Sequence, residues 1–200
     1  MTRRAFREAF ETILVALAVF LVLQASVQNF RVEGYSMEPT LGNGQYLLVN
    51  RLVYARVPSS VAGRLLAKDD ANQAAPAFAF HPPQRGDIVV FVSPGRLGPD
   101  YVKRVIGVPG DVVTMQDGTV SVNGLVVPEP YLASRDRYSL AAVVVPEGSV
   151  FVLGDNRPVS EDSRVFGPVP LENIVGKAWF GFWPMDRWAF LDRIGSQIAS

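Results

Sequence analysis

YVKRVIGVPGD, residues 101–111, is the stretch that most strongly indicates the fold class. Its β-branched residues suit a pleated strand, and Pro109 with Gly110 marks a turn at the end of that strand. Two charged residues, Lys103 and Arg104, lie between its apolar residues. Successive side chains of a strand point to opposite faces, so the pattern leaves open which of the two faces the core.

Six other segments show the same strand pattern. Each is short, rich in β-branched residues and bounded by Gly, Pro, Asp or Asn. These segments are residues 45–50, 87–92, 111–115, 119–122, 125–127 and 149–153. Asn123 and Gly124, between two of them, favour the type I′ turn of a β-hairpin. Because no long amphipathic helix is evident after residue 30, we predict a mainly β domain of antiparallel sheets over residues 30–200, built of hairpins as a sandwich or barrel.

The N-terminal segment has a different pattern. Residues 13–27 are uncharged, with Gln24 and Ser26 as their polar members. A bilayer span needs about 20 apolar residues, so this run is at the short end for one. Residues 9–10 and Phe30 extend it at the two membrane interfaces. We expect a transmembrane anchor at residues 12–29.

A cleaved signal peptide and a buried helix are the alternatives for this segment. Leu23-Gln24-Ala25 is a poor small-x-small cleavage site, which favours a retained anchor. Arginines at positions 3, 4 and 7 precede the apolar run and should stay in the cytoplasm. We therefore predict a single-pass protein of the plasma (inner) membrane, with residues 1–11 in the cytoplasm and residues 30–200 on the extracytoplasmic side.

Composition restricts the chemistry. Lys and Arg balance Asp and Glu at 19 each, so no bulk charge points to nucleic acid. The chain has no Cys and one His, which excludes thiol catalysis and Cys-ligated zinc and disfavours a His-rich metal site. That residue, His81, lies in an Ala- and Pro-rich stretch at residues 54–84, which we interpret as a surface insertion. Residues 134–142 predict a second, smaller loop.

Aromatic residues gather near the C-terminus. The three tryptophans of the chain are at positions 179, 183 and 188. A core strand and a closing segment would account for these rings. Amphipathic rings also favour the membrane interface, so docking of this segment on a membrane surface is a second hypothesis.

Residues 34–41, GYSMEPTL, place Ser36 in a turn. Pro39 fixes its own φ and biases Glu38 away from helix. A serine held on such a turn suits a nucleophile, although a plain loop leaving the anchor would have the same pattern. Without Cys or a suitable His, a Ser–Lys pair is the simplest nucleophile and base in this composition. Lys103 is the candidate base, because burial beside the charge of Arg104 would lower its pKa from the usual value of about 10.4.

Four segments resemble, in the same order, the sequence boxes of bacterial type I signal peptidases, also called leader peptidases. They are residues 34–41, 85–87, 101–111 and 154–164, and the resemblance extends from the apolar segment to about residue 184. Only the two predicted insertions fall outside it. The resemblance implies a membrane-bound serine endopeptidase that cleaves N-terminal signal peptides from secreted pre-proteins after small-x-small motifs. It implies no metal or cofactor. Its implied partners are signal peptides and the lipid bilayer, with translocation machinery left open.

The resemblance also implies residue roles. Ser36 matches the nucleophile, Lys103 the general base, and Ser160 a hydroxyl that orients the lysine amine. A supporting ionic network matches Asp155, Arg157, Asp162 and Arg164. The substrate is expected to bind extended against strand edges at Val32, Glu33, Gly34 and Tyr35 and at Asp100, Tyr101 and Val102. The backbone N–H of Ser36 is the expected oxyanion donor. One branch of the family adds a hydroxyl two residues before the nucleophile, and Gly34 occupies that position here.

Three other interpretations remain open. Self-cleaving repressors carry a DNA-binding helix-turn-helix before a related Ser–Lys protease, whereas this chain has an apolar segment there. A dedicated pilin-processing peptidase of a conjugation system would share the motifs and differ in its single substrate. A membrane-anchored β domain without activity, for adhesion or assembly, is the alternative from another class.

Overall fold

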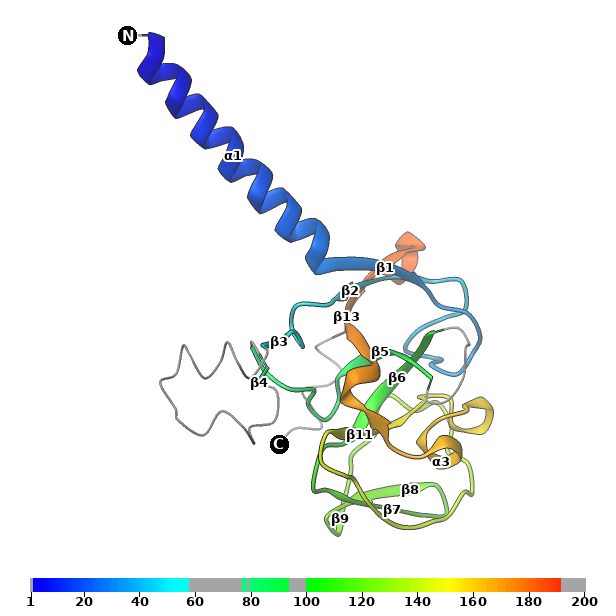
Figure 1. Cartoon of the computed structure of the whole chain (residues 1–200). Coiled ribbons are helices and arrows are strands. Elements are labelled where there is room, and N and C mark those ends of the chain that lie inside the picture. Colours follow the sequence, from blue (N-terminus) through cyan, green and yellow to red (C-terminus); the bar gives the residue numbers. More distant parts are fainter. Residues whose placement is uncertain (1, 58–76, 79, 94–99, 192–200) are drawn as a thin grey trace, which may run out of the picture.

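The computed structural model describes residues 2–57, 77–78, 80–93 and 100–191. A long helix, α1 (Thr2–Ser26), leaves one end of a β domain and projects away from it (Figure 1). Residues 58–76, most of the predicted insertion at 54–84, lie outside the described part of the chain. The mainly β fold with antiparallel sheets is confirmed.

Helix α1 exposes apolar side chains along its length. Phe6, Phe10, Leu14 and Phe20 are each more than half exposed. Within the described ranges, no helix combines the length and apolar character that a membrane crossing requires. The helix also ends earlier than the predicted anchor. Residues 27–29 belong to strand β1 (Val27–Arg31), whose antiparallel pairing with the next strand replaces helical hydrogen bonds.

One large antiparallel sheet forms most of the domain. Its order is β1-β2-β13-β5-β6-β11-β12, and β14 pairs with β13. The strands after β1 are β2 (Tyr46–Asn50), β5 (Ile88–Val92), β6 (Asp100–Gly107), β11 (Ser149–Leu153), β12 (Val169–Pro170), β13 (Ile174–Trp183) and β14 (Ala189–Phe190). Strand β13 is the longest and lies between β2 and β5, so chain segments distant in sequence meet at the centre of the sheet.

A second sheet has four antiparallel strands in the order β10-β7-β8-β9. Its strands are β7 (Val112–Gln116), β8 (Thr119–Val122), β9 (Leu125–Val126) and β10 (Leu140–Val144). A short pair, β3 (Arg56–Val57) and β4 (Ala77–Phe78), stands apart. The remaining elements are the helix α3 (Ser163–Phe166) and the 3-10 turns η1 (Arg157–Val159), η2 (Leu171–Asn173) and η3 (Met185–Arg187).

Each of the seven segments predicted as strands overlaps a strand of the structure. The predicted loop at residues 134–142 is wrong in part, because Leu140 begins β10. This strand pairs with β7 through an irregular register, and it shows no alternation that the sequence pattern would reveal. The aromatic segment is also more regular than expected, since β13 extends over ten residues.

The side chains packed beneath residues 34–41 form a buried apolar cluster. Met37 and Leu41 are fully buried in one cluster with Leu47 and Ile88. Burying such side chains contributes about 2 kcal/mol each. Two anchors on either side of Pro39 therefore fix the turn that presents Ser36.

Candidate active site

Ser36 lies on a turn whose backbone is hydrogen-bonded within itself. Glu38 N–H donates to the Tyr35 carbonyl at 3.2 Å, and Leu41 N–H donates to the Met37 carbonyl at 2.9 Å. The Ser36 side chain is partly exposed, whereas the next residue is fully buried. The turn is thus anchored from below and presents the hydroxyl above the sheet.

Lys103 reaches this hydroxyl from strand β6. Its Nζ is 2.7 Å from Ser36 Oγ and 3.1 Å from the Val102 carbonyl oxygen. The lysine side chain is only 3 % exposed, and Arg104 is fully buried on the other face of the strand. Both charged residues of β6 are therefore inside the domain, and alternation sends them to different partners.

Burial lowers the pKa of Lys103 from 10.5 to about 8. The carboxylates of Asp162, Asp155 and Glu161 oppose this shift, and Arg164 adds to it. We expected the charge of Arg104 to lower the pKa of Lys103, and this prediction is wrong. Arg104 is paired with Asp155, and the cation that lowers this pKa is Arg164. With a pKa near 8, about one molecule in ten carries a free amine at pH 7.

Arg104 and Asp155 connect the strand to the turn. Arg104 Nε and Nη2 donate to the two carboxylate oxygens of Asp155 at 2.9 and 2.6 Å. Arg104 Nη1 donates to the Gly86 carbonyl at 3.0 Å, and the Thr40 hydroxyl donates to Asp155 at 2.5 Å. This buried pair therefore joins β6, the segment after β11 and the turn that carries Ser36. Two-point arginine–carboxylate contacts of this kind fix geometry as well as charge.

Asn156 adds a second connection to the turn. Its backbone N–H donates to the Ser36 carbonyl at 2.9 Å, and its side-chain amide donates to the Tyr35 carbonyl at 3.0 Å. Residues 154–156 follow β11, so the sheet determines the position of the serine backbone. The sequence gives no separate signal for this role of Asn156.

The predicted residues Arg157, Asp162 and Arg164 form the network below. Arg164 donates to both oxygens of Asp162, at 2.7 and 2.8 Å, and to the Arg157 carbonyl at 2.8 Å. Asp162 also accepts from Gly154 N–H at 3.0 Å. Two partners were missed from the sequence. Glu129 pairs with Arg157, and Asp136 pairs with Arg164.

Ser160 does not make the predicted contact with Lys103. Its Oγ is buried and has no hydrogen-bond partner within the described residues. The hydroxyl packs against Gly154 instead: a Cβ at that glycine would overlap Ser160 Oγ and would lie 2.5 Å from the Ser36 carbonyl oxygen. The close approach of the Ser160 side chain and the Ser36 backbone requires glycine at position 154.

A cleft of about 300 Å³ opens in front of Ser36. Five residues predicted for substrate binding line it: Val32, Glu33, Asp100, Tyr101 and Val102. Gly34 and Tyr35 do not, since Gly34 N–H donates to Asn43 Oδ1 at 3.0 Å and the Tyr35 carbonyl is held by Asn156. The aliphatic and phenyl side chains of the lining are Phe30, Val32, Leu47, Val90 and Val102.

One wall of this cleft has a backbone edge that no other described strand pairs with. Strand β5 pairs with β6 along residues 100–104, whereas β11 pairs with β6 only from Arg104 onward. On the opposite wall, the N–H and carbonyl of Val32 bond to residues 44–45, so the outward-facing groups belong to its neighbours Arg31 and Glu33. Two backbone edges thus face the same cleft.

His81 lies elsewhere in the domain. Its ring stands edge-on to Tyr54, and its Nδ1 is 2.8 Å from the Pro82 carbonyl oxygen. The described residues contain no cluster of His, Cys, Asp and Glu suited to hold a metal ion. At the cleft, the serine hydroxyl and the lysine amine that meet are those of Ser36 and Lys103.

The sequence is similar to known peptidases over most of its length. The family model described as "Signal peptidase, peptidase S26" matches residues 6–183. A probable signal peptidase I-1 from Synechocystis sp. is 37% identical over 193 residues, 92% of this chain and 86% of that protein. Signal peptidase I from Bacillus caldolyticus is 38% identical over 191 residues, 88% of this chain and 91% of the relative.

Signal peptidase IB of Staphylococcus aureus (strain MRSA252) is 34% identical over 198 residues, covering 90% of each chain. A crystal structure of a signal peptidase I from Enterococcus faecalis V583 is 38% identical in sequence. It aligns with a TM-score of 0.45 over 48% of this chain and 97% of its own. From the extent of the family match and the identity to these relatives, the chain belongs to the signal peptidase family, peptidase S26.

Proposed function

We propose that Ser36 is the nucleophile and Lys103 the general base of a signal peptidase that cleaves secreted pre-proteins after small-x-small motifs. The observation that supports this most directly is the 2.7 Å hydrogen bond between Lys103 Nζ and Ser36 Oγ, at the wall of a cleft with free backbone edges. A buried lysine with a lowered pKa is suited to accept a proton near neutral pH.

The reaction follows from this pair. The neutral amine of Lys103 takes the proton of Ser36 as Oγ attacks the scissile carbonyl, and the resulting ammonium protonates the leaving amine. An acyl-enzyme remains on Ser36, and water activated by the same amine hydrolyses it. The carboxylates of Asp155, Asp162 and Glu161, which raise the pKa of Lys103, stabilise the ammonium form that each step produces.

Stabilisation of the oxyanion is assigned to the backbone N–H of Ser36. This group makes no hydrogen bond to another described residue, so it is free to donate to a developing oxyanion. Gly34 brings no hydroxyl, and its N–H is already bound to Asn43 Oδ1. Asn43 thereby holds a residue with φ of +97°, a value that favours glycine, two positions before the nucleophile.

The substrate is proposed to bind as an added strand. Its segment before the scissile bond would lie between the free edge of residues 100–103 and the outward groups of Arg31 and Glu33. Val90, Val102 and Leu47 line this space with apolar side chains. A cleft of about 300 Å³ leaves room for small side chains beside an extended backbone.

We further propose that α1 holds the enzyme at the membrane, with residues 1–11 cytoplasmic and the β domain outside. The support is the absence of charge between Glu11 and Arg31 and the exposure of apolar side chains on α1. Uncharged helix from Thr12 to Ser26 is about 22 Å long at 1.5 Å per residue, less than the hydrocarbon core of a bilayer. The polypeptide on either side would complete the attachment in the interfaces.

The test of the catalytic pair uses the full chain in a non-ionic detergent and a peptide whose signal segment ends Ala-Gln-Ala. Ser36→Ala and Lys103→Ala should each lower kcat/KM by a thousandfold or more, on the order found when a member of a catalytic triad is removed. The matched controls are Ser121→Ala, in the second sheet, and Lys177→Ala, in β13, whose lysine is paired with Asp87. Full activity in either variant of the pair would reject it.

Labelling separates this function from a β domain without activity. A serine-directed acylating inhibitor should modify Ser36 stoichiometrically, and the modification should be lost in Lys103→Ala. Labelling of other serines to the same extent would argue against an activated nucleophile.

A further inference from the structure

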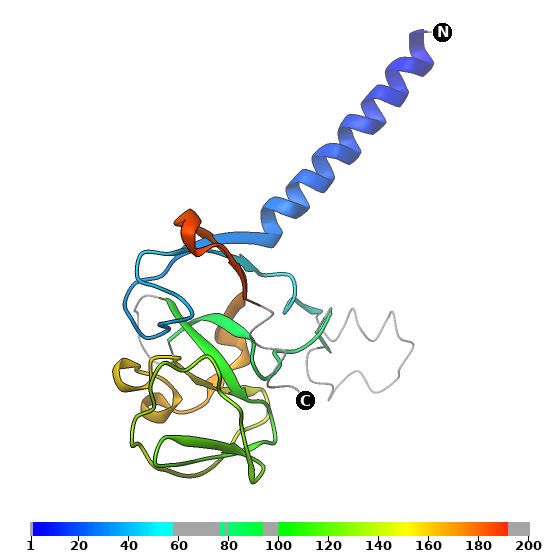
Figure 2. The same cartoon turned by 180° about the vertical axis from the view of Figure 1, so that it is seen from behind.

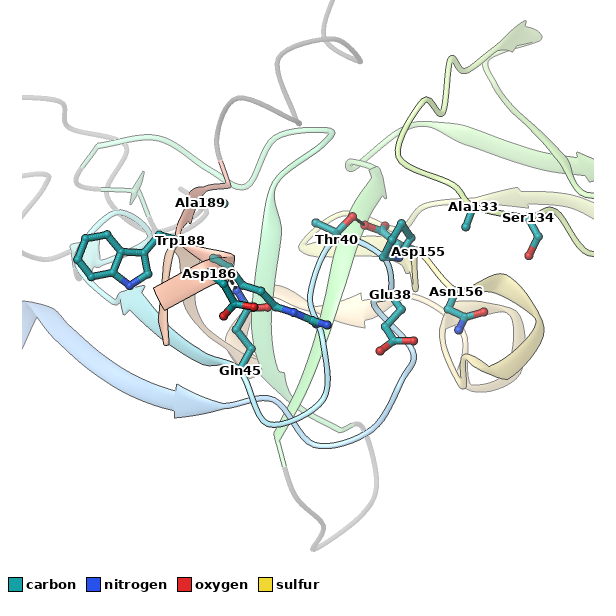
Figure 3. Close-up of a pocket in the computed structure, with 12 residues that line it drawn as sticks. Glu38, Thr40, Gln45, Ala133, Ser134, Asp155, Asn156, Asp186, Trp188 and Ala189 are labelled. Carbon is teal, nitrogen blue, oxygen red and sulfur yellow. Dashed lines mark hydrogen bonds between the residues drawn. The ribbon is translucent and has the colours of Figure 1, made fainter. Parts of the chain in front are cut away.

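A second cavity lies on the other side of the catalytic turn. It has a volume of about 680 Å³ and shares no lining residue with the cleft in front of Ser36. Figure 3 shows Glu38 and Thr40 of the turn on one side of the cavity. Asp186, in η3, and Trp188, directly after η3, lie on another side. Because Ser36 lines the cleft and Glu38 lines the cavity, the turn separates the two spaces.

The cavity begins next to the nucleophile. Asn156 lines it and donates its backbone N–H to the Ser36 carbonyl at 2.9 Å. An extended peptide advances about 3.3 Å per residue, so two or three residues beyond the scissile bond are enough to enter this space. A substrate whose signal segment occupies the cleft must continue past Ser36, and this cavity adjoins the residue that holds the Ser36 carbonyl.

The far wall of the cavity is fixed to the same turn. Gln45 accepts a hydrogen bond from Gly42 N–H at 3.0 Å and donates to the Arg187 carbonyl at 3.1 Å. The guanidinium of Arg187 packs directly on Gly42, at a position that a Cβ would occupy. These contacts join η3 to the catalytic turn, so the cavity keeps its shape without a ligand.

The charges that line the cavity give it a negative balance. Its charged residues are Glu38, Asp155, Asp186 and Arg187. Asp155 is neutralised by Arg104, which leaves two carboxylates and one guanidinium, a net charge of −1. Neither Glu38 nor Asp186 forms an ion pair with another residue of the described chain. Asp186 is exposed and Glu38 is half-buried.

We propose that this cavity receives the first residues of the mature protein and that Glu38 and Asp186 make cleavage depend on their charge. The inference rests on the proposed signal peptidase function and adds a determinant on the mature side of the scissile bond. Basic residues at the second and third mature positions favour cleavage, and acidic ones oppose it. The effect is electrostatic and partly exposed to solvent, so it weakens at high ionic strength.

Three peptides test this. They share a signal segment ending Ala-Gln-Ala and carry Lys-Lys, Ser-Ser or Glu-Glu at the second and third residues after the scissile bond. The full chain in non-ionic detergent should cleave the Lys-Lys peptide with a kcat/KM about fivefold above that of the Glu-Glu peptide at low salt. The double variant Glu38→Gln, Asp186→Asn should bring this ratio close to one.

The ratio between peptides is the measured quantity because it does not depend on the amount of active enzyme. The double variant Glu147→Gln, Glu172→Gln removes the same two charges from exposed residues at a different cavity and should keep the wild-type ratio. Equal cleavage of the three peptides by the wild type, or a ratio unchanged in the double variant, overturns the inference and leaves the proposed function standing. Failure to cleave any of the peptides rejects the proposed function itself.

Discussion

Arg104 and Asp155 form a two-point ion pair with both side chains almost completely buried, one residue along β6 from Lys103. The pair neutralises the charge nearest in sequence to the lysine, and through Thr40 it also holds the turn that carries Ser36. The ion pair thus fixes the geometry around the candidate base, while burial is the largest cause of the lowered pKa of Lys103.

The pH dependence of cleavage should follow Lys103. A base acts only when neutral, and this lysine has a pKa of about 8, so kcat/KM should rise about tenfold per pH unit below 8 and level off above pH 9. The carboxylate of Glu161 raises this pKa, so Glu161→Gln should move the midpoint to lower pH. Glu147→Gln is the control of equal charge and should leave the midpoint unchanged. A flat profile between pH 6 and 9 would contradict the assignment.

Lys103 should also make the folded protein less stable. Its pKa is lower in the folded state than in the unfolded chain, so the unfolded chain binds more protons between pH 8 and 10.5 and stability rises with pH across that window. Below pH 8 the cost is about 3 kcal/mol, from the 2.5 units between 10.5 and 8.

Lys103→Met should therefore be inactive and more stable than the wild type at pH 7. Urea unfolding at pH 7 and pH 10 measures the difference, which should fall below about 1 kcal/mol at pH 10 because the native lysine is then neutral. A variant less stable than the wild type at both pH values would show that the packing of the lysine stem outweighs its desolvation.

The buried pair of Glu129 and Arg157 should matter for folding. Both side chains are inaccessible to solvent, and Arg157 Nε also donates to the Gly154 carbonyl at 3.0 Å. Glu129→Gln leaves the arginine charge without a counter-ion and should lower the free energy of unfolding by about 3 to 5 kcal/mol.

Replacing both members of that pair is the control. Glu129→Leu with Arg157→Met removes the two charges together and should recover a large part of the loss, because no isolated charge stays buried. Urea unfolding of the single and double variants at pH 7 gives the comparison. Equal losses in both would contradict this account, because removing the isolated charge would then recover nothing.

Local patterns predict the strands well because β-branched runs between turn residues report on backbone preference. They fail where pairing decides the structure. Strand β10 has no alternating pattern and exists because β7 lies beside it, and residues 27–29 leave the apolar segment to pair with β2. Both differences arise from partners distant in the sequence.

The same limit applies to the site. Ser36 and Lys103 follow from composition and motif, since few other pairs could act as nucleophile and base. Glu129 and Asp136, each 28 residues from its arginine, carry no local sign of their partners. Ser160 shows the opposite failure: its motif position is met, but its hydroxyl packs against Gly154 and makes no hydrogen bond to the amine.

Gly154 should not tolerate even a methyl group. An added Cβ would lie 2.5 Å from the Ser36 carbonyl oxygen and would overlap Ser160 Oγ. Gly154→Ala should displace the serine backbone, and a shift of about 1 Å in such a group costs on the order of a hundredfold in rate. Steady-state kinetics at pH 8 checks this, with circular dichroism as the measure of folding.

A second substitution distinguishes the two contacts of that methyl group. Ser160→Gly in the Gly154→Ala background removes the overlap with the hydroxyl and leaves the contact with the Ser36 carbonyl. The double variant should therefore stay impaired. Recovery of wild-type kcat would locate the effect at Ser160 and not at the nucleophile.

Exposed aromatic side chains should bind the β domain to a membrane surface. Trp183, Trp188 and Phe190 are each at least half exposed, and Met185 between them is 67% exposed. Figures 1 and 2 place this segment, around η3, at the same end of the domain as β1 and the base of α1. A membrane reached by α1 would meet these rings, which favour the interface between headgroups and hydrocarbon.

Replacing Trp183, Trp188 and Phe190 with serine in the full chain should lower its affinity for vesicles of phosphatidylcholine and phosphatidylglycerol. The matched control is Leu125→Ser with Val126→Ser, which removes exposed apolar side chains from β9 in the second sheet. Flotation with vesicles measures both. The aromatic variant should lose more binding than the control, because its apolar area lies beside α1 and would add to the membrane attachment that we propose for that helix. Equal binding by the two variants would assign membrane attachment to α1 alone.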